Sequence, residues 1–221
     1  MRVVLFGGSG MVGQGVLRES LLDPDVERVL SVGRSGSGQT HPKLTELVHK
    51  DLYEYASIED RLAPFDACFF CLGVSSVGMS EAEYRQVTYD LTIAAAETLS
   101  RLNPGMTFIY VSGVGTDSSE RGRIRWARVK GQTENALLRM PFRAAYMFRP
   151  GVIVPLHGIK SKTRGARLIY ALTGPILPWL ARRWPEQITT TEKLGRAMLT
   201  AAKQGAPKTI LEPPDIAALS G

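Results

Sequence analysis

A glycine-rich loop near the amino terminus constrains the fold of this chain more than any other feature. The apolar run 2–6 passes directly into Gly7-Gly8-Ser9-Gly10-Met11-Val12-Gly13, and a segment of helical periodicity follows. Glycines spaced by three between a strand and a helix allow a tight turn and leave room for a pyrophosphate, which Cβ atoms would block. The helix would direct its free N–H groups and its positive dipole end at the phosphates. We therefore predict a dinucleotide site rather than a glycine-rich turn without a ligand. Its residues in this loop are Gly7, Ser9, Gly10, Met11, Val12 and Gly13.

The rest of the chain alternates apolar runs of strand length with longer segments of helical periodicity. The expected strands are 2–6, 27–32, 44–48, 66–72, 107–112, 144–148 and 209–211. The expected helices are 11–22, 58–62, 80–102, 121–140, 168–183 and 192–204. This alternation is typical of βαβ units, in which helices cover both faces of a parallel sheet. We predict an α/β fold, a doubly wound parallel sheet of the Rossmann type with about seven strands. One domain would span 1–221, with a substrate-side cap at 150–190.

The end of the second expected strand bears on the choice of cofactor. A site that prefers NAD(H) usually places Asp or Glu here to hold the ribose 2′-hydroxyl. This chain has Arg34 and Ser35 instead, and a guanidinium can bind phosphate oxygens in bidentate fashion. The alternative is an ordinary solvated arginine. We predict that NADP(H) is preferred over NAD(H).

Four further segments resemble the short-chain dehydrogenase/reductases, in particular their atypical and extended branches with an amino-terminal G-x-x-G-x-x-G loop. These segments are Asp51-Leu52, Cys71-Leu72-Gly73, Tyr110-Val111-Ser112-Gly113-Val114-Gly115 and Phe148-Arg149-Pro150-Gly151. The phrases Cys-Leu-Gly, Val-Ser-Gly-Val-Gly and Val-Lys-Gly-Gln-Thr-Glu are most similar to the small branch related to the Tat-interacting protein. The resemblance covers most of the chain.

The resemblance implies roles for individual residues. Asp51 and Leu52 would flank the adenine ring, and Cys71, Leu72 and Gly73 would pass the ribose and nicotinamide side of the cofactor. Ser112 would be the family's serine at the strand end.

The family's catalytic pair, Tyr-x-x-x-Lys, is altered in this chain. In the family the lysine holds the nicotinamide ribose and lowers the tyrosine pKa, so that the phenol exchanges a proton with the substrate. Lys130 stands at the lysine position, but Trp126 stands at the tyrosine position. An indole donates a hydrogen bond but cannot serve as this acid or base. The catalytic candidates are therefore Lys130 and Ser112, with Trp126 in place of the acid.

Composition limits the other functions. The chain carries 27 Lys and Arg against 21 Asp and Glu, a net charge of +6, which favours anionic partners. Basic residues gather at 121–130 and at 160–167, but no nucleic-acid-binding signature accompanies them. Cys68 and Cys71 have the spacing of a redox or metal motif, but on a strand they would face opposite sides, and no second cysteine pair exists. The three histidines show no metal-ligand spacing, so we expect no metal. The apolar stretch 168–184 is too short to span a membrane and would form a lid, a subunit contact or a surface helix on a membrane.

Two functions from different classes follow. The first is an NADP(H)-dependent oxidoreductase or epimerase-like enzyme that acts on a small carbonyl or hydroxyl compound with an atypical proton donor. The second is a non-catalytic NADP(H)-binding protein that regulates or assembles a protein partner, which Trp126 favours. Either form could be a homodimer. The amino terminus lacks the apolar region of a signal peptide, and we expect a cytoplasmic protein with no transmembrane segment.

Overall fold

Seven parallel strands form the main sheet of the computed structural model, which describes residues 1–159 and 188–221. Their order is β3-β2-β1-β4-β5-β6-β9. The strands are β1 (Arg2–Phe6), β2 (Arg28–Gly33), β3 (Leu44–Val48), β4 (Ala67–Phe70), β5 (Thr107–Val111), β6 (Ala144–Phe148) and β9 (Ile210–Leu211). Each adjacent pair is parallel. The predicted fold class and the predicted number of strands in this sheet are confirmed.

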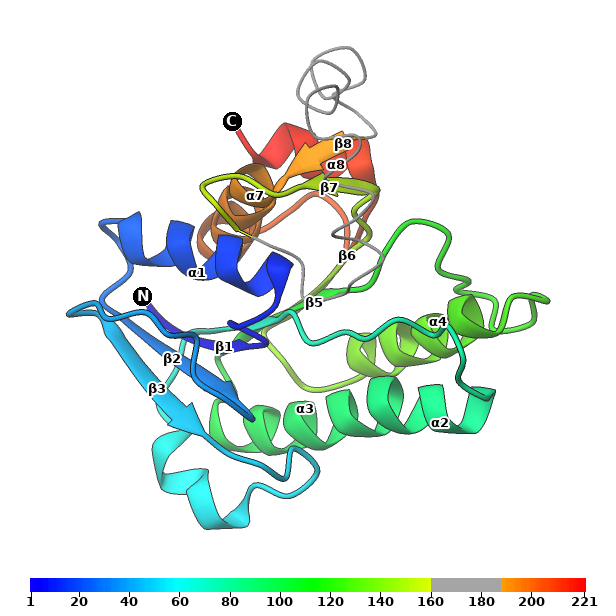
Figure 1. Cartoon of the computed structure of the whole chain (residues 1–221), viewed down its shortest axis with the longest axis horizontal. Coiled ribbons are helices and arrows are strands. Elements are labelled where there is room, and N and C mark those ends of the chain that lie inside the picture. Colours follow the sequence, from blue (N-terminus) through cyan, green and yellow to red (C-terminus); the bar gives the residue numbers. More distant parts are fainter. Residues whose placement is uncertain (160–187) are drawn as a thin grey trace.

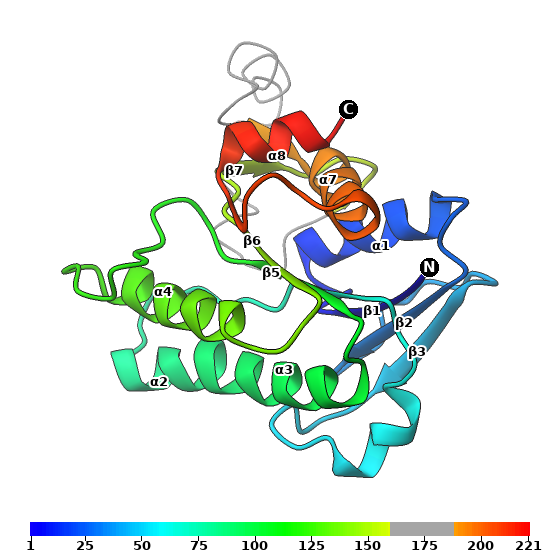
Figure 2. The ribbon, with the colours of Figure 1, turned by 180° about the vertical axis from the view of Figure 1, so that it is seen from behind.

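Helices cover both faces of the sheet, as Figures 1 and 2 show from opposite sides. One face carries α1 (Met11–Leu22), α7 (Thr191–Gln204) and α8 (Pro213–Leu219). The other carries the 3₁₀ helix η1 (Ala56–Arg61), α2 (Glu81–Arg85), the π-helical turn η2 (Gln86–Asp90), α3 (Leu91–Leu102) and α4 (Arg125–Leu138). None of the helices in the described part of the chain is long and apolar enough to cross a membrane.

The sheet separates two apolar cores because its central strands alternate their side chains between the faces. In β1, Val3 and Leu5 pack beneath α1 and α7, whereas Val4 and Phe6 pack on the opposite side with the aromatic rings of β4 and β5. All four side chains are fully buried. Near-continuous apolar runs are the expected sequence of strands buried on both faces.

Several elements differ from the prediction. The helix expected at 121–140 begins at Arg125, because the Asp117 carboxylate accepts the backbone N–H groups of Ser119 and Gly122 and folds 117–122 into a turn. The helix expected at 80–102 contains the π-helical turn, and that at 58–62 is a 3₁₀ helix.

Some elements were missed or lie outside the described residues. The two-stranded sheet of β7 (Val152–Val154) and β8 (Ile188–Thr190) was not predicted, nor was α8. The helix expected at 168–183, the surface-helix hypothesis for 168–184, the basic group at 160–167 and most of the expected cap at 150–190 lie outside the described residues.

The direction of strand addition reverses between β1 and β4. From β1 the sheet extends through β2 and β3 on one side and through β4, β5, β6 and β9 on the other. In open α/β sheets, ligands bind beyond the carboxyl ends of the strands at such a reversal. The loops that follow β1 and β4 are therefore the first place to look for a site.

Candidate functional site

The loops after β1 and β4 touch each other, and glycine makes the contact possible. Gly7 has a φ of +85°, and a Cβ on it would lie 2.8 Å from both the carbonyl carbon and the oxygen of Cys71. A Cβ on Gly13 would lie 2.0 Å from the carbonyl oxygen of Gly7. Neither position accepts a side chain without moving backbone. The fold itself therefore requires these two glycines.

The start of α1 has a different character. Gly10 is its N-cap and has an ordinary φ of −82°. A Cβ there would meet only the Gly7 carbonyl oxygen, at 3.3 Å, with nothing else within 4 Å. No side chain caps the helix, and its first turn, which begins with Met11 and Val12, contains no acidic residue. The first N–H groups of α1 are thus left without an intrahelical partner or a capping side chain, which suits an anion.

The loop after β2 carries the residues expected to face the adenosine ribose. Arg34 and Ser35 are both exposed. A carboxylate does lie near this loop, but it belongs to Glu46 on β3 and was not predicted. The Glu46 carboxylate accepts the backbone N–H of Ser37 at 2.5 Å, and a Cβ on Gly36 would lie 2.6 Å from its Oε2. The Glu46 carboxylate therefore fixes the loop through its contacts with Gly36 and Ser37.

The predicted adenine pair divides into one exposed and one buried residue. Asp51 is exposed, and its carboxylate accepts the backbone N–H of Tyr53 at 2.9 Å. Leu52 is buried in the core beside η1 and α3. After β4, Cys71 and Leu72 are partly buried and Gly73 is exposed, and Cys71 donates its backbone N–H to Phe6. All three residues follow the β4 end at the reversal point.

A buried polar network joins the ends of β5 and β6. Ser112 directly follows β5, and its hydroxyl donates to Oε1 of Glu134 at 2.5 Å. Glu134, on α4, is fully buried, and Arg149, directly after β6, donates to both of its carboxylate oxygens. Arg149 also donates to Ser118 at 2.5 Å and to Glu212 at 3.0 Å. The hydroxyl proton of Ser112 therefore points into this network.

Lys130 and Trp126 lie one turn apart on α4, so they share a face of the helix. The Lys130 ammonium donates to the backbone carbonyl of Ser112. Burial lowers the pKa of Lys130 to about 8, although the nearby Glu134 carboxylate acts in the opposite direction. The Trp126 ring lies over the loop after β5, with its Cη2 3.5 Å from where a Cβ on Gly115 would be. The structure thus places the Lys130 ammonium at the Ser112 carbonyl, and the Trp126 ring beside the loop that follows β5.

No role was predicted for Glu134 or Arg149, although both lie within the motifs that carry the family resemblance. A signal for Glu134 was present, because it follows Lys130 by four residues and therefore shares its helix face. Arg149 comes from another element, and its pairing with Glu134 had no sequence signal.

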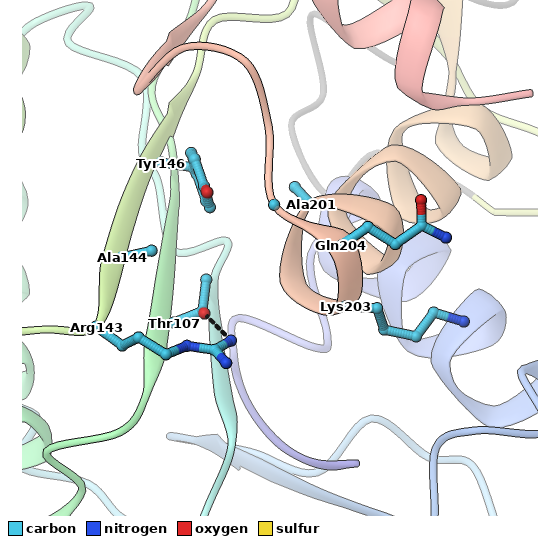
Figure 3. Close-up of a pocket in the computed structure, with 8 residues that line it drawn as sticks. Thr107, Arg143, Ala144, Tyr146, Ala201, Lys203 and Gln204 are labelled. Atoms are coloured by element: carbon cyan, nitrogen blue, oxygen red, sulfur yellow. Dashed lines mark hydrogen bonds between the residues drawn. The ribbon is translucent and has the colours of Figure 1, made fainter.

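A separate pocket lies at the opposite edge of the sheet, where β5 and β6 begin. It has a volume of about 210 Å³ and is drawn in Figure 3. Its lining includes Thr107, Tyr146 and the end of α7, and Arg143 donates to the Thr107 hydroxyl at 2.8 Å. This pocket contains none of the predicted site residues.

Comparisons with known proteins come from relatives and from solved structures, since no family model matches the chain. The chain is similar to the protein fmp52-1, mitochondrial, of Aspergillus terreus, with 27% identity over 86% of this chain and 84% of the relative. It is similar to fmp52, mitochondrial, of Emericella nidulans, with 26% identity over 90% and 86%. Because these relatives are named as mitochondrial proteins, the prediction of a cytoplasmic location is wrong.

Solved structures with the same fold bind nicotinamide dinucleotides or are named as epimerases and reductases. The Bordetella bronchiseptica enzyme WbmF in complex with NAD⁺ has a TM-score of 0.68 and 14% identity, over 98% of this chain and 76% of that one. An epimerase from Helicobacter pylori, ADP-L-glycero-D-manno-heptose-6-epimerase, gives 0.70 and 17%, over 96% and 76%. A short-chain dehydrogenase/reductase family oxidoreductase from Burkholderia thailandensis gives 0.67 and 16%, over 100% and 93%. The chain therefore shares the Rossmann fold of these proteins, a doubly wound parallel sheet, as its sequence predicted.

Proposed function

We propose that this chain binds NADP(H) at the carboxyl edge of its sheet and reduces a small carbonyl compound there. The observation that carries the proposal is the start of α1. An uncapped helix without an acidic first turn follows a loop in which Gly7 and Gly13 hold the backbone in close contact. Backbone N–H groups and the helix dipole at such a point favour a pyrophosphate.

The residues present fit the dinucleotide along the predicted path. The glycine loop and the first turn of α1 would hold the pyrophosphate, Cys71 to Gly73 would lie along its nicotinamide side, and Lys130 would hold the nicotinamide ribose. Bound there, the cofactor would supply a hydride. The protein would orient the substrate and provide a proton to the developing alkoxide.

The choice of NADP(H) over NAD(H) rests on the loop after β2. Arg34 and Ser35 are exposed there, and the nearby carboxylate of Glu46 already accepts the backbone N–H of Ser37. A ribose 2′-phosphate would gain a charge-assisted hydrogen bond from Arg34, worth about 1.5–3 kcal/mol or roughly 10- to 150-fold in affinity.

A non-catalytic NADP(H)-binding protein that regulates or assembles a partner is the second candidate. Trp126 favours it, because the family's proton donor is missing, and the hydroxyl of Ser112 is engaged by Glu134. Both candidates share the cofactor site and differ only in turnover.

Titration of the purified protein with NADPH and with NADH tests the shared site. We expect NADPH to bind at least 10-fold more tightly and Arg34→Ala to remove most of that difference. Arg28→Ala is the matched control, because Arg28 is also exposed but lies at the amino end of β2, the opposite edge. Equal affinities in the unaltered protein, or an equal effect of the two variants, would contradict the NADP(H) assignment.

A further inference from the structure

Reduction of a carbonyl at this site needs a proton donor other than the missing tyrosine. The other tyrosines near α4 are poorly placed. Tyr84 and Tyr110 are only 4% and 1% exposed, and burial raises the pKa of both. Tyr89 lies on η2, where its ring stacks with the guanidinium of Arg85, whose central carbon is 4.0 Å from the ring centroid. Burial also raises the pKa of the Cys71 thiol.

Ser112 is excluded by its hydrogen bond. Its hydroxyl donates to the fully buried carboxylate of Glu134, at 2.5 Å. A hydroxyl has one proton, so Ser112 cannot donate at the same time to a substrate oxygen.

Lys130 differs from these groups because the carboxylate that could pair with it, that of Glu134, is already bound to Arg149. Glu134 stands four residues later on the same helix, the spacing of a Glu–Lys pair, yet both of its oxygens accept from Arg149. Among the described residues, the only hydrogen-bond partner of the Lys130 ammonium is the Ser112 carbonyl at the end of β5. An ammonium has three N–H donors, so two are left for a ligand at this edge.

We propose that Lys130 is the proton donor of this site, in the place of the family's tyrosine. The proposal rests on the proposed reductase function. A reduced nicotinamide bound at this site would supply the hydride to the substrate carbonyl carbon. As the C=O π bond breaks toward oxygen, Lys130 would give that oxygen a proton from Nζ. The neutral Lys130 amine would then recover a proton from solvent, so that the products are an alcohol and the oxidised cofactor.

The electrostatic surroundings support a lysine that can give up its proton near neutral pH. Burial lowers the pKa of Lys130 to about 8, and the carboxylate of Glu134 opposes this change. The positive charge of Arg149 offsets Glu134. In the described part of the chain, charged and titratable groups face this part of α4 from several elements. They include Glu134 and Arg128 on α4, Arg149 after β6, Glu212 before α8, Tyr110 on β5, Asp117 after β5, and Tyr84, Glu81 and Arg85 on α2. A general acid works best with a pKa near the working pH.

The first experiment measures the titration of Lys130 without requiring activity. The full chain, with and without saturating NADPH, is pulse-labelled with acetic anhydride over pH 6–11, and each lysine is quantified by peptide mass spectrometry. We expect a midpoint for Lys130 near pH 8. Lys203 is the internal control, because hydrogen bonds to Asp23 and Asp25 raise its pKa. A Lys130 midpoint at or above that of Lys203 would overturn the proposal.

The second experiment uses Lys130→Arg, which keeps the positive charge but cannot release a proton in this range. The probe reaction is the oxidation of NADPH with 4-nitrobenzaldehyde and related small aldehydes. Because a guanidinium can still donate to the nicotinamide ribose, turnover is compared at saturating NADPH, where we expect a fall of about 100-fold or more. Native turnover should fall tenfold per pH unit above the Lys130 midpoint.

The outcomes separate the two proposals. Turnover retained by Lys130→Arg, or a native protein that binds NADPH and reduces none of the aldehydes, overturns Lys130 as donor while the cofactor site stands. Failure of NADPH to bind overturns the proposed function itself. In that case the pH midpoint of Lys130 acetylation can still be measured, and it shows whether the Lys130 ammonium loses its proton near neutral pH.

Discussion

Replacing Glu134 by Gln tests how the carboxyl edge of the sheet is held together. Arg149 binds two carboxylates, and they differ in burial: the Glu134 side chain is fully buried, whereas that of Glu212 is 42% exposed. Glu134→Gln removes the buried charge and turns one acceptor into a donor that faces the guanidinium. Glu212→Gln makes the same chemical change at the exposed partner of the same arginine.

The expected costs differ because of solvent screening. Breaking a buried pair from one side costs about 3–5 kcal/mol, and since Gln keeps one acceptor we expect about 3 kcal/mol for Glu134→Gln. An exposed pair contributes about 0–1 kcal/mol, so Glu212→Gln should cost about 1 kcal/mol or less. For a domain of this size the first change lowers Tm by about 6–12 °C and the second by at most about 4 °C.

Urea unfolding followed by circular dichroism measures both free energies of unfolding. Arg149→Met in each background then gives the two coupling energies by double-mutant cycle. The expected result is strong coupling of Arg149 to Glu134 and weak coupling to Glu212. Equal losses for the two glutamine variants would refute the reasoning, since burial would then have no influence on the strength of the pair.

Three further predictions concern the site residues. Gly10→Val should abolish NADPH binding in a calorimetric titration but leave the far-ultraviolet circular dichroism unchanged, and normal binding by this variant would show that the loop is a turn without a ligand. Gly13→Ala should instead lower Tm, because its Cβ would lie 2.0 Å from the Gly7 oxygen. Trp126→Tyr restores the Tyr-x-x-x-Lys pair and should raise aldehyde-dependent NADPH oxidation, but by less than the roughly 10²–10⁴-fold of a full general acid, because Lys130 already donates the proton in the native protein. A rate that collapses instead would give the indole a direct role in shaping the substrate site. Between about pH 8 and the ordinary lysine pKa of about 10.4, Lys130 binds fewer protons in the folded protein than in the unfolded chain, so the free energy of unfolding should rise with pH in that window. Lys130→Met should flatten this rise, and identical slopes for the two proteins would contradict the lowered pKa.

The sheet was predictable because its strands carry their own signal. The bounds of β1, β3 and β6 agree with the expected runs 2–6, 44–48 and 144–148. In β1 the reason is that an apolar run buried on both faces ends where solvent begins. The three-residue strands β7 and β8 are too short for any periodicity to show. Their pairing depends on bringing Val152–Val154 beside Ile188–Thr190, and the local sequence does not encode that contact.

Helix α8 was missed although a signal was present. Pro213 stands at its first turn, and Glu212 and Asp215 form a capping box around its start. Proline at this position begins helices rather than ending them, because the N–H group it lacks has no helical partner. Pro213-Pro214 alone predicts a loop, but together with Glu212 and Asp215 the same pair indicates the start of a helix.

The chemistry of the site depends on contacts that no local pattern contains. The glycine loop could be recognised because the spacing of its glycines is local, although the close approach of Cys71 to Gly7 is not. Whether Ser112 can donate a proton depends instead on Glu134, 22 residues later, and the availability of Glu134 depends on Arg149, a further 15 residues on. If Arg149 were absent, Glu134 would be free to pair with Lys130, stabilise its ammonium and raise its pKa. In the proposed mechanism, Arg149 would keep Glu134 from pairing with Lys130 and so leave the Lys130 ammonium available to donate a proton.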